Sequence, residues 1–333
     1  MVSLKENTEK LFFPSHSSLE QATPKTIAFY RAKRLKCCAA IDLCCGIGVD
    51  AIALAKNCEK VFAVETDKNV LECAKKNAEA EKIENIEFLN SDCFDVNLKS
   101  LNVEIAFADP SRRTKDRRVK GLDETKPSTK QLVRFLEKNK IEDFCIEVSR
   151  ELSPEEIPFN CEREYISLNG ELNCVSLYFG SLKKCERSAV SLPAGEIIES
   201  QSLKPKPFIE AGLPKKFLLE LDEAIVKSRL QAELLEKLGK NLSVFSENFF
   251  TSCSIQQSAF FVNCFEVLKE VKEKDLVAGL KALGAGRIVL RGRFDSRLQA
   301  LAKKEIEAQL SGKGKFHVLN LKNKVFICRL VQS

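Results

Sequence analysis

Four acidic side chains follow four successive apolar runs near the start of the chain: Asp42, Glu65, Asp92 and Asp109. If each run is a strand of one parallel sheet, the acids meet at its carboxyl edge, where open α/β sheets bind ligands. A carboxylate accepts hydrogen bonds from adjacent hydroxyls, so Glu65 suits a ribose. Asp92 is a second acid, placed to meet the edge of an adenine. One strand-end acid is often only a cap or turn residue, but four in this order favour a ligand site.

A glycine turn follows the first of these acids and reads Leu43-Cys44-Cys45-Gly46-Ile47-Gly48. Glycines in a strand-to-helix turn let the backbone approach a ligand and point amide N–H groups at it. The spacing is not GxGxxG, which counts against a dinucleotide fingerprint and therefore against an NAD-dependent dehydrogenase.

A basic loop follows the last acid. Asp109-Pro110-Ser111 leads into six positive charges against the single acid Asp116: Arg112, Arg113, Lys115, Arg117, Arg118 and Lys120. An arginine plane can stack on a base or clamp a phosphate. A solvated surface loop is the alternative, but the cluster begins at the strand end that would face an acceptor.

The elements that must position these residues alternate along the chain. Helices are expected at 24–35, 50–57, 69–81 and 129–138, and strands at 38–43, 60–64, 85–89, 103–108 and 144–148. This alternation predicts a parallel sheet with helices on both faces. Asn169-Gly170 between the runs 163–168 and 172–179 predicts an antiparallel hairpin that closes the sheet.

Four regions follow from this pattern. We expect an N-terminal helical segment over 1–36, a ligand-binding domain over 37–195, a linker and helical connecting region over 196–270, and a basic α+β domain over 271–333. Residues 215–240 are helix-prone, and 258–268 are expected to be a strand.

The last 63 residues hold 14 Lys/Arg and 5 Asp/Glu, leaving 39 basic and 42 acidic residues in 1–270. A basic module on a near-neutral body is typical of polyanion binding.

Residues 41–109 resemble the S-adenosylmethionine-binding core of class I methyltransferases. In that resemblance, residues 42–48 are motif I, with Cys44 where many members have glycine. Glu65 is the ribose acid, Asp92 lies near adenine, and Asp109-Pro110 is motif IV. The resemblance implies a Rossmann-like α/β fold, a mostly parallel sheet with a terminal antiparallel hairpin, and S-adenosylmethionine as cofactor. The cofactor residues would be Asp42, Cys44, Gly46, Gly48, Glu65 and Asp92.

Further segments resemble one prokaryotic subfamily of these enzymes: Leu19 to Thr23, Tyr30 to Ala32, Asp109 to Arg113, and Gly170 to Leu172. Its members carry a C-terminal THUMP-like domain, after an RNA-binding module, and Leu283-Gly284-Ala285 with the basic segment beyond it matches that domain. Gln21, Thr23 and Tyr30 would form either a lid over the site or a simple docking helix.

These observations favour methylation of a structured RNA, tRNA or rRNA, at a base nitrogen. The catalytic residues would be Asp109, Pro110 and Arg112. The substrate-binding residues would be Arg112, Arg113, Arg117, Arg118, Arg287, Arg291 and Arg293. Two alternatives stay open: a methyltransferase for a protein or an acidic small molecule, and an RNA-binding protein that has lost catalysis.

Composition bears on the cellular location of the protein and on whether it binds metal. No apolar run approaches the roughly 18 residues that a membrane span needs, and the start of the chain is charged rather than signal-like. Fourteen cysteines without a CxxC pair, and only two histidines, His16 and His317, argue against metal binding. We therefore expect reduced thiols, no metal, no membrane partner and a cytoplasmic enzyme.

Overall fold

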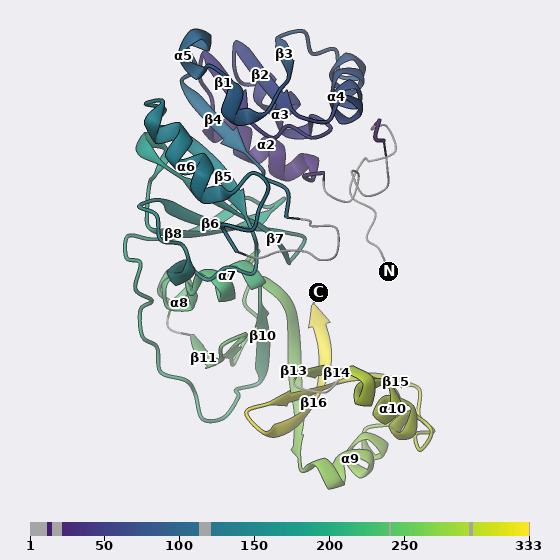
Figure 1. Ribbon diagram of the computed structural model, residues 1–333. Helices are drawn as coiled ribbons and strands as arrows, with labels where there is room; N and C mark the ends of the chain where they lie inside the picture. The colour runs from purple at the N-terminus through teal and green to yellow at the C-terminus, as the bar shows by residue number, and fades with distance from the viewer. Residues whose placement is uncertain (1–11, 15–21, 113–120, 240, 293–295, 333) are drawn as a thin grey trace. The chain divides into compact units, whose positions relative to one another are not determined.

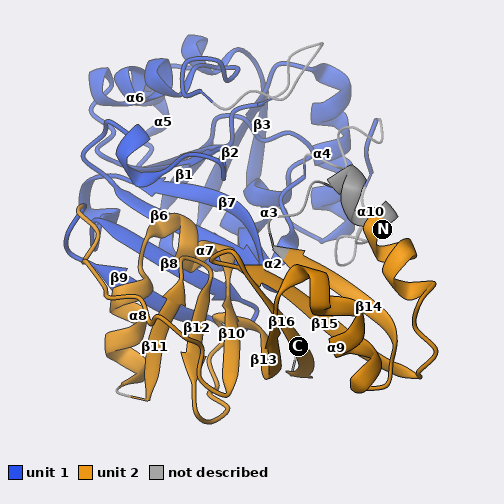
Figure 2. Cartoon of the chain, turned by 90° about the horizontal axis from the view of Figure 1, so that it is seen from below, with its two compact units in different colours: residues 1–203 blue, residues 204–333 orange. Residues whose placement is uncertain are grey.

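Two β-sheets organise the chain, one in residues 1–203 and one in residues 204–333, the two units coloured blue and orange in Figure 2. The computed structural model describes residues 12–14, 22–112, 121–239, 241–292 and 296–332. All structural statements below concern these residues, and each unit is described by itself.

The first sheet has the strand order β3-β2-β1-β4-β5-β7-β6-β8-β9. Its first five strands pair in parallel as predicted from the alternating pattern. They are β1 (Ala39–Asp42), β2 (Lys60–Glu65), β3 (Ile86–Asn90), β4 (Ile105–Ala108) and β5 (Asp143–Val148). β1 and β4 are almost completely buried, which explains why both read as continuous apolar runs.

The helices of this unit cover both faces of the sheet, as expected. They are α2 (Lys25–Arg34), α3 (Val49–Ala55), α4 (Lys68–Ala80), α5 (Leu98–Leu101) and α6 (Thr129–Lys138). Figures 1 and 2 show α5 and α6 on one face and α2 and α3 on the other. Capping fixes where they begin: the side chain of Asp67 accepts hydrogen bonds from the first turn of α4, and Ser128 caps α6.

An antiparallel hairpin follows β5, as the Asn-Gly pair predicts. Its strands are β6 (Glu162–Leu168) and β7 (Glu171–Tyr178), and both turn residues have positive φ, +53° at Asn169 and +80° at Gly170. β7 inserts antiparallel between β5 and β6. The hairpin does not end the sheet, however. β8 (Arg187–Leu192) adds in parallel to β6, and β9 (Glu196–Ser200) adds antiparallel to β8.

The second unit is built on a seven-stranded sheet of order β11-β12-β10-β13-β16-β15-β14. The strands are β10 (Phe217–Leu221), β11 (Leu242–Ser246), β12 (Phe249–Ser252), β13 (Phe261–Val271), β14 (Ala285–Gly292), β15 (Gly314–Leu321) and β16 (Lys324–Gln332). The helices are α7 (Glu223–Ser228), α8 (Gln231–Leu238), α9 (Leu276–Ala282) and α10 (Ser296–Glu307). From α9 onward the order is helix, strand, helix, strand, strand, which agrees with the α+β character expected of this part of the chain.

The structure differs from the expected linker and helical connecting region over 196–270, because strands in this range belong to the two sheets. β9 belongs to the first sheet, so that sheet continues past residue 195, and β10 to β13 belong to the same sheet as β14 to β16. β13 also crosses the expected boundary at 271 and pairs with β16 at the end of the chain. The helix-prone stretch 215–240 begins with a strand, because Phe217 to Leu221 pairs on both sides, with β12 and β13.

All fourteen cysteines are free thiols, and nine of them are buried. This agrees with their expected use as small apolar side chains. Among the described residues, no helix is long and apolar enough to cross a membrane.

Candidate active site

The turn between β1 and α3 contains two glycines with positive φ, Gly46 at +53° and Gly48 at +88°. A Cβ at Gly48 would lie 3.0 Å from the Cβ of Ala74, so glycine allows α3 to begin close against α4. A Cβ at Gly46 would meet nothing within 4 Å. Gly48 is therefore required by helix packing, whereas Gly46 borders open space in the cavity described below.

Glu65, at the end of β2, is held in place by the backbone around it. Its Oε2 accepts a hydrogen bond from the amide of Gly46 at 3.2 Å. Its Oε1 accepts from the amide of Asp67 at 2.9 Å and from the hydroxyl of Thr66 at 3.2 Å. These contacts join the carboxylate to the glycine turn, so the two predicted cofactor elements lie side by side.

Asp42 ends β1 and is fully buried beneath the same turn. Its Oδ1 accepts a hydrogen bond from the amide of Cys44 at 3.2 Å, while its Oδ2 has no partner among the described residues. Burial and the nearby Asp50 raise the pKa of this carboxyl well above its usual range. Cys44 lines the cavity, whereas Asp42 lies one layer below it.

Asp92 caps the short 3₁₀ turn that follows β3, which is a common structural role for an acid at the end of a strand. Its Oδ1 accepts a hydrogen bond from the amide of Phe94 at 2.9 Å, at the start of a short 3₁₀ turn, and the residue is exposed. The cavity is lined by its neighbours Ser91 and Cys93 rather than by Asp92.

Asp109 follows β4 and lines the cavity together with Pro110, Ser111 and Arg112. Burial and the carboxylate of Glu147 raise the pKa of Asp109 well above its usual range, and Arg112 opposes that shift. The three residues predicted to be catalytic, Asp109, Pro110 and Arg112, are therefore brought to one wall.

Glu147, at the end of β5, joins two arginines and was not identified from the sequence. One carboxylate oxygen accepts a hydrogen bond from Arg112 Nη2 at 3.1 Å, and the other accepts from Arg31 Nη1 at 2.9 Å. Arg31 is 1% exposed and also donates to Asp50 Oδ1 at 2.7 Å. Arg112 Nη1 is buried without a partner among the described residues, so the guanidinium has one donor group left for a ligand.

A signal for Glu147 was present in the sequence. It is a charged residue inside the apolar run Phe144 to Val148, and it is a fifth acid at the end of a parallel strand. Buried charges in proteins are usually paired, which implies an arginine or lysine partner from elsewhere in the chain. The partner Arg31 is 116 residues away, a distance that local spacing does not reveal.

These groups surround one cavity of about 640 Å³ in the first unit. Its charged lining residues are Asp50, Glu65, Asp109, Glu147, Arg112, Lys126 and Arg150. The volume lies within the usual range for ligand pockets, about 300–1,000 Å³. The carboxylates and cations are mixed, so the site suits a ligand with both positive and negative or hydrogen-bond-accepting groups.

The N-terminal segment also contributes to the cavity. Ala22, Thr23 and Pro24 line it, whereas the hydroxyl of Tyr30 donates a hydrogen bond to Glu164 at 2.9 Å. Gln21 and His16 lie outside the described residues. Thr23 is thus at the site, and Tyr30 instead fixes α2 to β6.

The predicted substrate arginines are only partly placed. Arg113, Arg117, Arg118 and Arg293 lie outside the described residues. Arg287 is exposed on β14, while Arg291 Nη1 donates to Glu220 Oε2 at 2.8 Å and its guanidinium stacks on the ring of Phe265. Arg291 is therefore committed to contacts within the second unit. No group of His, Cys, Asp or Glu in the described part of the chain could hold a metal ion.

Comparison with known proteins decides the class of this site. The sequence profile of the family described as "Methyltransferase domain" matches residues 40–131, which include the glycine turn, Glu65 and Asp109. The chain carries a methyltransferase domain. The expectations of an S-adenosylmethionine-dependent methyltransferase and of its cofactor are confirmed for this domain.

Curated relatives that match part of the chain include RNA methyltransferases. The 23S rRNA (uracil(1939)-C(5))-methyltransferase RlmD of Legionella pneumophila strain Corby is 34% identical over 91 residues, and that of strain Lens is 33% identical over 91 residues. Each match covers 26% of this chain and 20% of the relative. The chain thus spans only about a fifth of the length of these curated relatives.

The whole chain shares its fold with a solved structure. A candidate methyltransferase from Porphyromonas gingivalis W83 superposes with a TM-score of 0.76 and 17% sequence identity, over 97% of this chain and 84% of that one. Both units described above are therefore parts of a known architecture. None of these comparisons identifies the second unit as THUMP-like.

Proposed function

We propose that this chain transfers a methyl group from S-adenosylmethionine to a base nitrogen of a structured RNA, tRNA or rRNA. The observation that carries the proposal is the wall formed by Asp109, Pro110 and Arg112, with Arg112 fixed by Glu147. That wall opens on the same cavity as the glycine turn and Glu65. Donor and acceptor groups would therefore meet in one site.

The residues present fit the cofactor. S-adenosylmethionine supplies an electrophilic methyl group on a positively charged sulfur. Glu65 offers a fixed carboxylate for the ribose hydroxyls, and the open space at Gly46 allows close approach to the backbone. The unpartnered Oδ2 of Asp42 leaves a buried polar atom under the turn, and the carboxylates that line the cavity favour a ligand that carries positive charge.

On the acceptor side, Asp109 is suited to holding a proton. A carboxylate whose pKa is raised by burial accepts a proton more readily than a solvated one, and the acceptor nitrogen must lose a proton when it is methylated. Arg112 Nη1 would donate to an oxygen of the base or phosphate. Glu147 acts through Arg112, which it keeps at the cavity wall.

Three observations support RNA as the substrate class. The matched relatives methylate 23S rRNA. The basic residues between 112 and 120 continue directly from the acceptor wall. The last 63 residues carry 14 basic and 5 acidic side chains, and we propose that this part, 271–333, is the THUMP-like region that grips structured RNA, with Arg287 exposed on β14.

A second candidate is favoured by the cations inside the cavity. Arg112, Lys126 and Arg150 would also bind the carboxylate of a protein side chain or an acidic small molecule. A catalytically inactive RNA-binding protein is the third possibility. The residues that the cofactor needs are present in the turn, which disfavours an inactive protein.

We place the enzyme in the cytoplasm because all fourteen cysteines are free thiols.

One experiment separates these functions. The purified chain is incubated with methyl-labelled S-adenosylmethionine and either bacterial total RNA or a nuclease-treated protein and metabolite extract. We expect label in RNA, its loss after ribonuclease treatment, and none with Asp109→Asn. Label in protein or small molecules would replace the RNA proposal, and RNA binding without label anywhere would indicate an inactive binding protein. Nucleoside mass spectrometry of the labelled RNA then identifies the methylated atom.

A further inference from the structure

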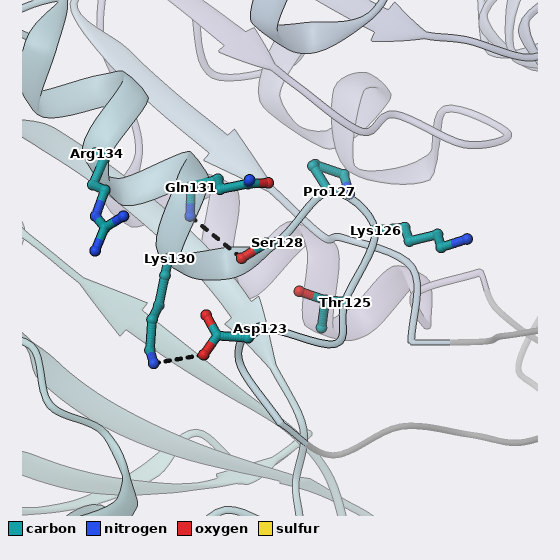
Figure 3. A pocket seen from close by; sticks show the side chains of 8 residues that line it. All are labelled: Asp123, Thr125, Lys126, Pro127, Ser128, Lys130, Gln131 and Arg134. Atoms are coloured by element: carbon teal, nitrogen blue, oxygen red, sulfur yellow. Dashed lines mark hydrogen bonds and ion pairs between the residues drawn. The ribbon is translucent and has the colours of Figure 1, made fainter.

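A second cavity of about 500 Å³ lies at the start of α6 in the first unit. Its charged lining residues are Asp123, Lys126, Lys130 and Arg134, and Figure 3 shows them around the junction between the loop and the helix. Lys126 and Pro127 line this cavity and the active-site cavity alike. The two cavities are therefore neighbours that share one wall.

The loop that forms this wall is tied to the acceptor side of the active site. Ser111 and Lys126 exchange two backbone hydrogen bonds, each of 2.9 Å, so Lys126 is bridged to the segment that holds Asp109 and Arg112. The hydroxyl of Thr125 accepts from the amide of Thr129 at 2.9 Å, which joins the loop to α6. These bonds hold the second cavity in a defined position beside Asp109.

The lining of this cavity has three cations and one acid, and only one of the cations is paired with the acid. Lys130 Nζ pairs with Asp123 at 2.6 Å, as the dashed line in Figure 3 shows. Lys126 and Arg134 are exposed and lie on opposite sides of the junction in Figure 3, and their side-chain cations have no ion-pair or hydrogen-bond partner among the described residues. Two such cations in the lining of a cavity of about 500 Å³ would recruit phosphate, since arginine and lysine are the usual phosphate partners in proteins.

We propose that this second cavity is a backbone-phosphate subsite, which binds a nucleotide that flanks the methylated base of the RNA strand. The proposal rests on the RNA substrate of the proposed function and adds where the strand runs, from the Asp109 wall over Lys126 toward Arg134. Phosphate contacts of this kind position a strand without reading its sequence. The subsite therefore sets the register of the RNA at the active site.

The test compares Arg134→Glu with Lys138→Glu. Lys138 is an exposed cation one turn further along α6 and outside the cavity, so both variants reverse one charge on the same helix. The probes are a fluorescein-labelled, mixed-sequence 15-nucleotide oligoribonucleotide and the same oligonucleotide with an uncharged methylphosphonate backbone. Binding is measured from 50 to 200 mM salt, and the affinity for S-adenosylmethionine is measured by calorimetry.

We expect Arg134→Glu to weaken binding of the charged probe about tenfold and to reduce the salt slope by about 0.7 for each phosphate that the protein no longer neutralises. Lys138→Glu should change binding less than twofold, the uncharged probe should not distinguish the variants, and both should bind S-adenosylmethionine like the wild type. Equal binding of the charged probe by the two variants overturns the subsite. If Arg134→Glu loses affinity while the wild type methylates no RNA, the subsite stands and the proposed enzymatic function fails.

Discussion

Arg31 and Arg112 are held by the same carboxylate, that of Glu147, with one arginine on each oxygen. Arg31 comes from the helix that precedes the sheet, and Arg112 from the loop that faces the acceptor. Because Arg31 is buried and also bound to Asp50, it fixes the carboxylate from below. The orientation of Arg112 in the active site thus depends on a residue that does not line the cavity.

Removal of Arg31 should destabilise the fold. In Arg31→Leu the buried carboxylates of Asp50 and Glu147 lose their shared cation, and breaking a buried ion pair in this way costs about 3–5 kcal/mol. The free energy of unfolding is measured by urea titration. Lys33→Leu, an exposed position on the same helix, should lose less than about 0.5 kcal/mol. Similar losses in both variants would contradict the structural role given to Arg31.

Glu65→Ala should weaken the binding of S-adenosylmethionine. A carboxylate that accepts hydrogen bonds contributes about 1.5–3 kcal/mol, which corresponds to a Kd increase of about 10- to 150-fold. Calorimetry measures the change, and Glu59→Ala, an exposed acid in the loop before β2, is the matched control. Equal affinity in the two variants would show that Glu65 supports the turn without contacting the cofactor.

Asp109→Asn should separate binding from turnover. We expect an unchanged Kd for S-adenosylmethionine and a turnover about 10²- to 10⁴-fold lower, because the amide cannot take up a proton. Since burial raises the pKa of Asp109, its carboxyl binds a proton in the folded state at pH values where it is ionised in the unfolded chain. Ionised Asp109 is less favourable in the folded state, so the free energy of unfolding falls as pH rises above the pKa that Asp109 has in the unfolded chain. Asp109→Asn should lose this pH dependence. Retained turnover would remove Asp109 from the acceptor site.

Gly48→Ala should be more disruptive than Gly195→Ala. Both residues have positive φ, +88° and +75°, so an alanine at either position is strained by about 1–2 kcal/mol. Only at Gly48 would the new Cβ lie 3.0 Å from Ala74, whereas nothing lies within 4 Å at Gly195. We expect an additional loss of about 1–3 kcal/mol at Gly48 in urea unfolding. Equal losses would mean that α4 moves away without cost.

The buried His317 should make the second unit sensitive to acid. Burial, together with Arg291 and Lys315, lowers the pKa of His317 to about 4, and its Nδ1 has no partner among the described residues. Between pH 6.5 and 4 the unfolded chain binds a proton that the folded state does not, so the free energy of unfolding falls as pH falls. His317→Leu lacks this contribution, and its stability relative to wild type should rise as pH is lowered. A difference that stays constant from pH 7 to 4.5 would contradict this.

The cofactor half of the fold could be predicted because most of its strands are buried on both faces. β1, β2 and β4 read as apolar runs. An acid ends each of the first two and follows the third, and the chain order places all three acids on one edge. β8 could not be predicted in this way. Its sequence, Arg187 to Leu192, has buried polar residues, and hydrogen bonds from Ser188 to Glu162 and from Arg187 to the carbonyl of Ser202 make that burial possible.

The active site also contains residues that could be predicted from the sequence and residues that could not. Residues whose role follows from chain order, such as Glu65 and Asp109, lie at the cavity as predicted. Asp92 has the expected residue type and position, but its carboxylate is used by the local backbone of the following turn. Glu147 and Arg31 depend on a contact across 116 residues, which only the tertiary structure brings together.

The helix before the sheet has a consequence for how the chain can be divided. A fragment that begins at residue 37 would retain Asp50, Glu147, Glu162 and Glu164 while losing Arg31 and Arg34, which neutralise them. Such a fragment would contain every cofactor motif, yet Asp50, Glu162 and Glu164 would lose their arginine partners and Glu147 would keep only Arg112. The smallest autonomous methyltransferase fragment must therefore include α2 and start no later than Lys25, upstream of the glycine turn.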